Sequence, residues 1–290
     1  MIVPFSAGGP ADVLGRLIAE KLTRSLGQTV VVINKDGAGT ILGVDMAAKA
    51  TPDGYTLLLG NVAMVINSSA GKRLPYTLQR DLVPVSLAFT QPLILVINPA
   101  LPIANLKEFI AYAKANPGKL KYGSSGIGTS IHLTSELFRN AAGIDLTHIP
   151  YKGAAPALTD LLGGQTQIMF ASLVSALPHV RQARLRALGV TTMKRAAALP
   201  EVPAISESGL RGYDVSVWMG IVAPAGTPPA IIAQLNRQIA ALLQSPDIRE
   251  RLAVQGLEAA SKSPAEFRTY IASEVRKWAV VIKQAGVVAD

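Results

Sequence analysis

Two glycine-rich segments of the chain combine a compact backbone with hydroxyl side chains, a combination that suits the binding of a small anion. The first, Ser6–Asp12, follows a short apolar run and precedes apolar residues at helical spacing. Gly8 and Gly9 allow a tight turn and let a ligand approach the backbone closely. Pro10 and Asp12 suit the first turn of the helix that follows. The segment therefore predicts a strand, a glycine turn and a helix N-terminus, which is a ready anion site. An ordinary connection whose glycines serve only geometry is the alternative.

The second segment, Gly123–Thr129, again joins a predicted strand to a predicted helix. Ser124, Ser125 and Thr129 place hydroxyl groups among backbone N–H groups, and together these groups can hold a carboxylate or a phosphate. A dinucleotide-binding fingerprint would need glycine at position 131, where the chain has Ile131. The Gly-Lys-Ser/Thr sequence of a P-loop is also missing at the required spacing.

The histidines and serines do not form a recognisable catalytic set. His132 lies one turn into the helix that follows the second segment, where it can hydrogen-bond a ligand or cap the loop. A serine-hydrolase elbow would need glycine two residues after Ser125, where Ile127 stands. His148 and His179 are isolated, and no cluster of carboxylates accompanies them, so the sequence predicts no metal site. The sequence shows no nucleophile paired with a general base and no motif for an electron carrier. It therefore favours a binding protein over an enzyme, and it predicts no cofactor.

The composition excludes several other functions. The net charge of +9 favours anionic partners, but the lysines and arginines are scattered singly rather than gathered into a basic stripe, so we expect no nucleic-acid binding. The absence of cysteine rules out disulfides, thiolate metal sites and cysteine catalysis. No apolar run approaches the roughly 18–20 residues that span a bilayer. The chain opens inside what looks like the first strand, so we expect that an upstream segment was removed or left out.

The elements that position the two segments follow an α/β pattern. A β-α-β-α-β order from Ile2 to Leu59 predicts a parallel sheet covered by helices, and a second α/β run extends from Leu120 to Val190. Breaks at Pro99–Pro102 and Pro224–Pro229 separate these runs from each other and from three closing helices. Ligands of open α/β sheets lie outside the carboxyl ends of the strands, where both glycine segments fall. The sequence therefore predicts two α/β lobes with a ligand cleft between them.

Some individual elements are specific enough to be compared with a structure. Thr29–Ile33 is predicted to be a buried strand because of its β-branched run. Val83–Phe89 and Leu93–Ile97 are predicted as two further strands. Asn105 and Glu108 have the spacing of a capping box at the start of a helix.

The order and spacing of several short stretches resemble the Bug family, the periplasmic substrate-binding proteins of tripartite tricarboxylate transporters. The resemblance runs from residue 2 to the C-terminus, and its specificity comes from the whole series rather than from any one stretch. The matching stretches are Val3–Asp12, Gly37–Gly39, Pro52–Leu57, Asp81–Val85, Gly123–Thr129 with His132 and Leu133, Pro150–Gly153 with Pro156 and Ala157, Leu199–Pro203, and Ala223–Pro228.

The resemblance implies a type II periplasmic-binding-protein fold, in which each lobe is a mixed, mainly parallel sheet covered by helices. It implies a discontinuous first lobe, residues 1–98 plus 224–290, and a second lobe, residues 99–223. It further implies a monomer in the periplasm that captures a small carboxylate and passes it to the permease subunits of a membrane transporter. Family ligands include organic diacids, acidic amino acids and aromatic acids.

The predicted ligand-binding set combines the two loops with Asn61, His132 and residues after later strands. Family members often carry an acidic or amide residue where this chain has Ala171 and Ser172, which favours a plain organic acid over an amino acid. Two alternatives remain open at this point: a two-lobed hydrolase or transferase that uses Ser125 and His132, and a ligand sensor that signals to a membrane partner. The full set is Phe5, Ser6, Ala7, Gly8, Gly9, Asp12, Asn61, Ser124, Ser125, Gly126, Gly128, Thr129, His132, Tyr151, Lys152, Gly153 and Ser172.

Overall fold

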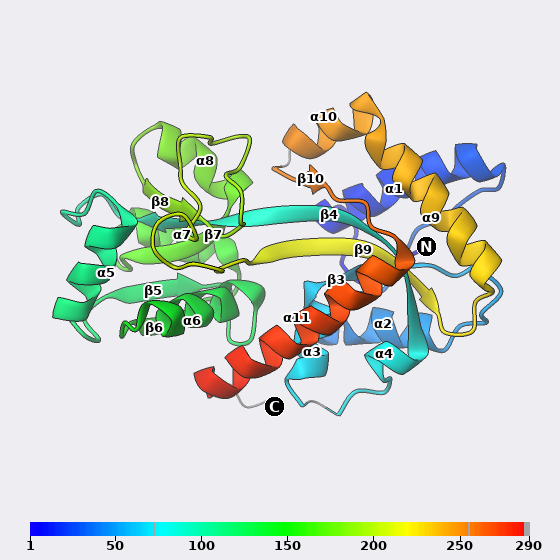
Figure 1. Ribbon diagram of the computed structural model, residues 1–290, viewed down its shortest axis with the longest axis horizontal. Coiled ribbons are helices and arrows are strands. Elements are labelled where there is room, and N and C mark those ends of the chain that lie inside the picture. Colours follow the sequence, from blue (N-terminus) through cyan, green and yellow to red (C-terminus); the bar gives the residue numbers. More distant parts are fainter. Residues whose placement is uncertain (72, 255, 287–290) are drawn as a thin grey trace.

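The computed structural model describes residues 1–71, 73–254 and 256–286, and it has two lobes that lie side by side (Figure 1). Positions 72, 255 and 287–290, which belong to the predicted first-lobe range, lie outside the described residues. Two strands run along the junction of the lobes, β4 (Leu82–Ile97) and β9 (Ser216–Pro224). The residue boundaries of the lobes given above stay predictions.

The first lobe gathers elements from both ends of the chain, as the blue and the orange-red ribbons of Figure 1 show. Its strands are β1 (Ile2–Val3), β2 (Ile33–Asn34), β3 (Leu58–Asn61) and β10 (Glu258–Ala259). Its helices are α1 (Pro10–Leu26), the 3-10 turn η1 (Ala38–Thr40), α2 (Ile41–Ala48), α3 (Val62–Ser69), α4 (Leu78–Asp81), α9 (Pro229–Gln244), α10 (Pro246–Val254) and α11 (Pro264–Ala285).

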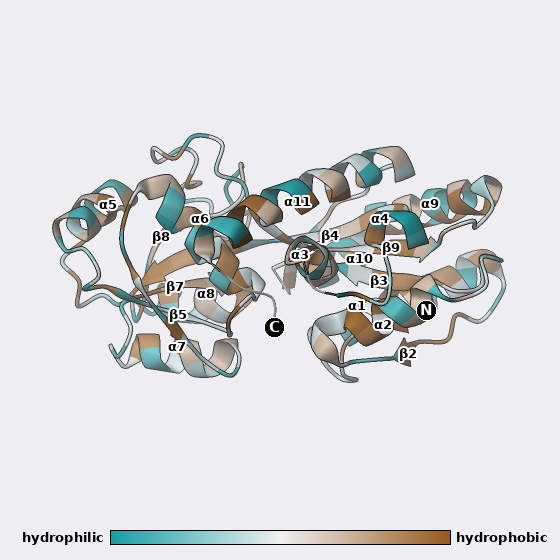
Figure 2. Ribbon diagram, turned by 90° about the horizontal axis from the view of Figure 1, so that it is seen from below, coloured by the Kyte–Doolittle hydropathy of each residue, from teal (hydrophilic) through white to brown (hydrophobic). Residues whose placement is uncertain are grey.

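The second lobe is built from the middle of the chain. Its strands are β5 (Lys121–Ser124), β6 (Thr147–Pro150), β7 (Ile168–Ser172) and β8 (Arg186–Val190). Its helices are α5 (Leu106–Ala115), α6 (Ser130–Ala142), α7 (Ala154–Leu162) and α8 (Leu173–Arg181). In Figure 2 the strand β7 is brown, while the helices around it carry teal patches, as expected of a buried sheet under amphipathic helices.

A continuous path of strands connects the two lobes, in the order β2-β1-β3-β9-β4-β7-β5-β6. In the first lobe β1 is parallel to both β2 and β3, and in the second lobe β5 is parallel to both β6 and β7. The strand β4 belongs to both sheets, because its residues 82–92 pair with β9 and its residues 93–97 pair with β7 and β8. The two strands predicted in this region are therefore one strand of 16 residues.

The local sequence explains how α1 begins and ends. Leu14, Leu17, Ile18 and Leu22 are buried on one face, at the helical spacing that predicted the helix. Gly27 ends the helix in the left-handed conformation, with φ of 69°, and its N–H bonds the carbonyl of Thr23.

One predicted strand is shorter and more exposed than expected. Of the segment Thr29–Ile33, only Ile33 is in a strand, and its side chain is 46% exposed, while Val31 is 63% exposed. The reason is position in the sheet, because β2 lies at the outer end of the strand path and has one neighbour, β1.

The capping prediction for α5 is confirmed in part, since Asn105 Oδ1 accepts the N–H of Glu108 at 3.0 Å.

The helix α11 lies against both lobes and stabilises their arrangement. Trp218 Nε1 of β9 and Trp278 Nε1 of α11 both donate to the buried carboxylate of Glu274, at 3.2 and 3.1 Å. Further along α11, Asn140 Nδ2 of α6 donates to Gln284 Oε1 at 3.2 Å. No helix of the described residues is both long and apolar enough to cross a membrane.

Candidate functional site

The predicted site residues follow the carboxyl ends of strands in both lobes. The first loop, Phe5–Gly9, comes just after β1, and Asn61 ends β3. The second loop, Ser125–Thr129, follows β5, and Tyr151–Gly153 follow β6. Because β1 and β3 are parallel to each other, as are β5 and β6, these ends meet at one edge of each sheet.

The carboxylate of Asp12 holds the first loop in shape. Its Oδ2 accepts the N–H of Gly8 at 2.8 Å and the Arg16 Nε at 2.9 Å, and its Oδ1 accepts Asn34 Nδ2 at 2.9 Å. The Arg16 guanidinium, the Gly8 N–H and the Asn34 amide together lower the pKa of this carboxyl to about 2. Asp12 is 3% exposed, so it acts as an anchor of the loop and stays ionised at neutral pH.

The rest of the first loop is open to solvent. Ser6, Ala7 and Gly8 are exposed, and Ser6 Oγ donates to Asp36 Oδ2 at 2.7 Å. Gly8 has φ of 80°, a conformation that favours glycine. Within the described chain the N–H groups of Ala7 and Gly9 have no hydrogen-bond partner, so they are available to an anion at the start of α1.

The second loop is closed by its own hydroxyl groups. Ser125 Oγ donates to Thr129 Oγ1 at 3.0 Å, and Thr129 Oγ1 donates to the carbonyl of Gly126 at 2.8 Å. Gly126 and Gly128 have φ of 124° and 73°, which an L-residue rarely adopts. Ser124 is fully buried below the loop, and its Oγ accepts the N–H of Gly126 at 3.1 Å.

Two histidines stack beneath this loop. The rings of His132 and His148 lie 4.0 Å apart at an angle of 13°, and the ring of Tyr122 lies beside both, 4.8 Å from His148 and 6.4 Å from His132. His132 Nδ1 accepts the N–H of Gly128 at 3.0 Å, and His148 Nε2 lies 2.7 Å from Ser124 Oγ. Burial lowers the pKa of both histidines to about 4, so both are neutral at physiological pH. Both therefore hold the loop without adding charge.

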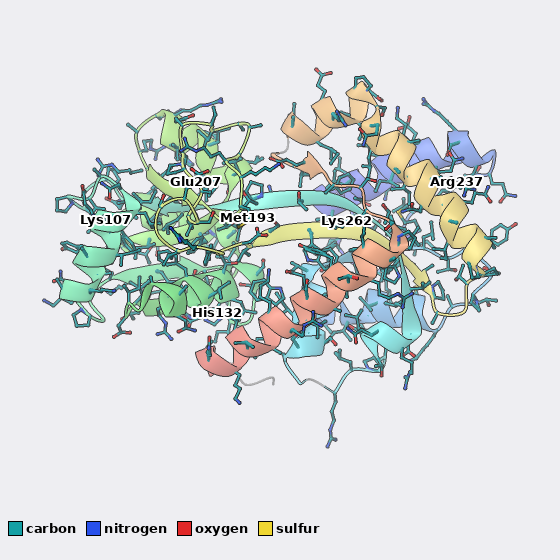
Figure 3. The ribbon with its side chains drawn as sticks, in the orientation of Figure 1. Lys107, His132, Met193, Glu207, Arg237 and Lys262 are labelled. Carbon is teal, nitrogen blue, oxygen red and sulfur yellow. The ribbon has the colours of Figure 1, made fainter. Side chains whose placement is uncertain are left out.

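The role of His148 was missed from the sequence, where this residue looked isolated. The register of the parallel strands β5 and β6 places His148 opposite Tyr122. No local motif in the sequence encodes that pairing, because the two strands are joined through α6. Figure 3 shows His132 on α6 in the second lobe, opposite the lobe that carries Arg237 on α9.

The serine–histidine pair of the enzyme alternative is not formed. Ser125 Oγ is bonded to Thr129, and His132 Nδ1 is occupied by the N–H of Gly128. The serine that does contact a histidine, Ser124, is 0% exposed. A serine nucleophile must reach its substrate, so this pair is unsuited to covalent catalysis. No group of three potential metal ligands occurs among the described residues.

Tyr151–Gly153 lie beside the second loop. The N–H of Tyr151 bonds the carbonyl of Ser124 at 3.1 Å, and its hydroxyl donates to Asp160 Oδ2 at 2.7 Å. Burial and the hydrogen bond to Asp160 raise the pKa of the Tyr151 hydroxyl to about 12. Lys152 is exposed, and Gly153, with φ of 111°, precedes the first turn of α7. Tyr151–Gly153 therefore add the ammonium group of Lys152 and the N-terminus of α7 next to the second loop.

Asn61 and Ser172 each cap the helix that follows their strand. Asn61 Oδ1 caps α3 by accepting the N–H of Ala63 at 2.8 Å, while its buried Nδ2 has no partner in the described chain. Ser172 caps α8, and its Oγ lies 2.7 Å from Ser175 Oγ.

Four cavities of the structure have defined linings, and none of these four is lined by both loops. The meeting of the loops on one ligand stays a prediction.

Comparisons with known proteins identify relatives over nearly the whole chain. A sequence profile described as "Tripartite tricarboxylate transporter family receptor" matches residues 14–287. Protein BugT of Bordetella pertussis is 41% identical over 288 residues, which are 99% of this chain and 88% of that protein.

Solved structures give the same result. Rpa4515 of R. palustris, solved with adipate, superposes with a TM-score of 0.81 at 34% identity, covering 99% of this chain and 97% of the other. MatC from Rhodopseudomonas palustris, solved with bound malate, gives 0.77 at 31% identity, covering 97% of each chain. The periplasmic binding protein BugD gives 0.78 at 36% identity, covering 100% of this chain and 98% of the other. These neighbours bear out the two-lobed periplasmic-binding-protein fold.

Proposed function

The chain belongs to the tripartite tricarboxylate transporter family of receptors, and from this premise we propose that it captures a small organic carboxylate between its two lobes. The observation that carries the proposal is the pair of neutral, amide-rich loops at the carboxyl ends of parallel strands, one in each lobe. Relatives that share about a third of the sequence were solved with adipate and with malate.

The proposed site uses hydrogen-bond donors rather than a buried charge. In the first loop, the free N–H groups of Ala7 and Gly9 face an anion with the start of α1 behind them. In the second loop, the N–H groups of Ser125 and Ile127, which have no partner among the described residues, are the donors before the start of α6. A helix N-terminus stabilises an adjacent anion by about 0.3–1 kcal/mol, or by about 2 where the site is partly buried. Lobe closure over the ligand would bring both contributions to one carboxylate.

The remaining predicted residues give the site its other walls. Asn61 offers a buried amide nitrogen without a partner, and Lys152 offers an exposed ammonium group. Ser172 follows the fully buried Ala171, and neither residue carries a charge that would select an amino group. We therefore assign a plain organic acid as the preferred ligand, and we expect a dicarboxylate to bind more tightly than an amino acid.

The proposal extends to the lobes, the location and the partner. Lobe 1 comprises residues 1–98 plus 224–290 and lobe 2 comprises residues 99–223, with β4 and β9 as the strands between them. The protein works as a monomer in the periplasm and delivers its ligand to the membrane permease subunits of a transporter. It catalyses no reaction, and the hydrolysis of p-nitrophenyl acetate should stay at the rate seen in buffer alone.

Isothermal titration calorimetry with adipate and malate tests the proposal, with 1,6-hexanediol as an uncharged control. Gly8→Val should weaken binding at least about tenfold, because a branched side chain in the loop blocks the approach of the carboxylate. Gly212→Val is the matched control, since Gly212 has φ of 79° against 80° for Gly8 and a Cβ at either position meets no atom within 4 Å. Equal affinity for the diol, or equal loss in both variants, would contradict the proposed site.

A further inference from the structure

A glycine of the first lobe lies directly against the second lobe. Gly256 closes the turn after α10, where its N–H bonds the carbonyl of Ala253 at 2.9 Å, and its φ is 62°. A Cβ at this position would lie 2.7 Å from Val174 Cγ2, 3.6 Å from Val174 N and 3.7 Å from Leu173 Cβ. Leu173 and Val174 belong to the first turn of α8 in the second lobe. Gly256, Leu173 and Val174 together form what we name the lobe contact.

The lobe contact lies where β4 passes from one sheet to the other. Glu258 of β10 pairs with Thr90 and Ser172 of β7 pairs with Leu93, so the two strands join β4 at positions only three residues apart. Figure 1 shows β10 and α8 on one side of β4 and α11 on the other. Because β4 belongs to both sheets, a change in the angle between the lobes has to bend it here. Such a change therefore also alters the distance between Gly256 and α8.

The lobes also touch through α11, but with a different kind of contact. Lys277 Nζ donates to the carbonyl of Asp214 at 3.2 Å, and Asn140 Nδ2 donates to Gln284 Oε1 at 3.2 Å. These contacts use polar side chains with several rotatable bonds, which can follow a small movement of one lobe. At the lobe contact, a glycine backbone meets a β-branched side chain, which is stiff at χ1. The lobe contact is therefore the stiffer of the two kinds.

The angle between the lobes matters for a ligand that is held from both sides. Hydrogen bonds from N–H groups to oxygen have lengths of about 2.7–3.2 Å, which leaves a tolerance of a few tenths of an ångström. One donor loop of the proposed site belongs to each lobe. A shift of one lobe by the amount that a Cβ at position 256 would require is as large as this tolerance.

We infer that Gly256 is a positioning residue for ligand binding, because its lack of a side chain lets α8 lie against the first lobe at the angle at which both loops reach one ligand. Gly256 acts through Val174 and the orientation of the lobes, without touching the ligand itself. The inference rests on the proposed function, since it concerns the affinity of the same site.

Gly256→Ala adds the one carbon atom for which the lobe contact has no room. It should weaken adipate binding at least about fivefold in isothermal titration calorimetry, because overpacking here displaces one lobe relative to the other. Gly143→Ala is the matched control. Gly143 ends α6 with φ of 60°, and a Cβ there would meet no atom within 4 Å. This control carries the same strain of a left-handed alanine and should leave the affinity unchanged.

Val174→Ala removes the atom with which the new Cβ collides. In the double variant Gly256→Ala/Val174→Ala, the backbone nitrogen of residue 174 and Leu173 Cβ lie at 3.6 and 3.7 Å, which are ordinary contact distances. The double variant should therefore bind adipate as tightly as Val174→Ala alone, although the strain of the backbone persists. The same loss of affinity from Gly256→Ala with and without Val174→Ala would overturn the role of the lobe contact.

Spin labels measure the arrangement of the lobes without any ligand. The chain has no cysteine, so Lys107→Cys in α5 and Arg237→Cys in α9 provide one label on each lobe, at positions that Figure 3 shows on opposite sides of the molecule. Gly256→Ala should shift the distance between the labels, and Gly143→Ala should not. An unchanged distance in Gly256→Ala overturns the inference, whatever the ligand does. A wild-type protein that binds neither adipate nor malate overturns the proposed function, and a shifted label distance then still confirms that Gly256 sets the lobe angle.

Discussion

The stability of the protein should fall as the pH is lowered from 6.5 to 5, because the stacked His132 and His148 are neutral in the folded chain. Burial is the largest cause that lowers the pKa of each from 6.5 to about 4; Arg139 adds to it for both, and His132 adds to it for His148. The unfolded chain takes up these two protons near pH 6.5, whereas the folded chain takes them up only near pH 4. The unfolded state therefore binds more protons in this interval, so the free energy of unfolding rises with pH.

The magnitude follows from the same linkage. A histidine with an unfolded pKa of 6.5 that stays neutral in the folded protein lowers the free energy of unfolding by about 1.6 kcal/mol between pH 6.5 and 5. The two stacked histidines together contribute about 3 kcal/mol. This result does not depend on the folded pKa as long as it lies well below 5.

Urea unfolding at several pH values between 6.5 and 5 measures this loss. The variants His132→Gln and His148→Gln should each retain about half of this loss of unfolding free energy. The double variant should lose the whole contribution of the two histidines to the pH dependence. A double variant with the same pH dependence as the wild-type protein would refute the assignment of neutral, stacked histidines under the second loop.

Three further changes test the structure elsewhere. Asp12→Asn should lower the stability by about 1–2 kcal/mol in urea unfolding, because it removes the charge from three hydrogen bonds; an unchanged midpoint would contradict the anchor role. Gly220→Ala should cost at least about 2 kcal/mol by the same measurement, since its Cβ would lie 2.4 Å from Phe267 Cζ. Glu274→Ala should cost about 3 kcal/mol or more, because two buried indole N–H groups lose their acceptor; Glu250→Ala, at an exposed position, is the control and should cost little.

Much of the fold was predictable because it depends on local patterns. The apolar periodicity of α1 and the glycine that ends it are both present in the structure. The edge position of β2 was not predictable, because an apolar β-branched run such as Thr29–Ile33 looks the same in a central strand and in an edge strand. The union of two predicted strands into β4 depends on pairing with β9, which is more than a hundred residues away in sequence.

The site shows the same division. The glycine turns, the cap by Thr129 and the anchoring position of Asp12 follow from local spacing. The partner of Asp12 in the next strand, Asn34, and the stack of His148 under the second loop depend on strand register. Contacts of this kind join segments that are distant in sequence, so a single sequence does not reveal them.

The central claim is that loops from both lobes hold one carboxylate. A crystal structure of the protein with adipate tests this claim most directly. We predict that one carboxylate of the ligand lies within about 3 Å of an N–H group of Ala7 or Gly9 and of a donor in Ser125–Thr129. Ligand density in contact with only one loop, or on an unrelated surface, would contradict the account.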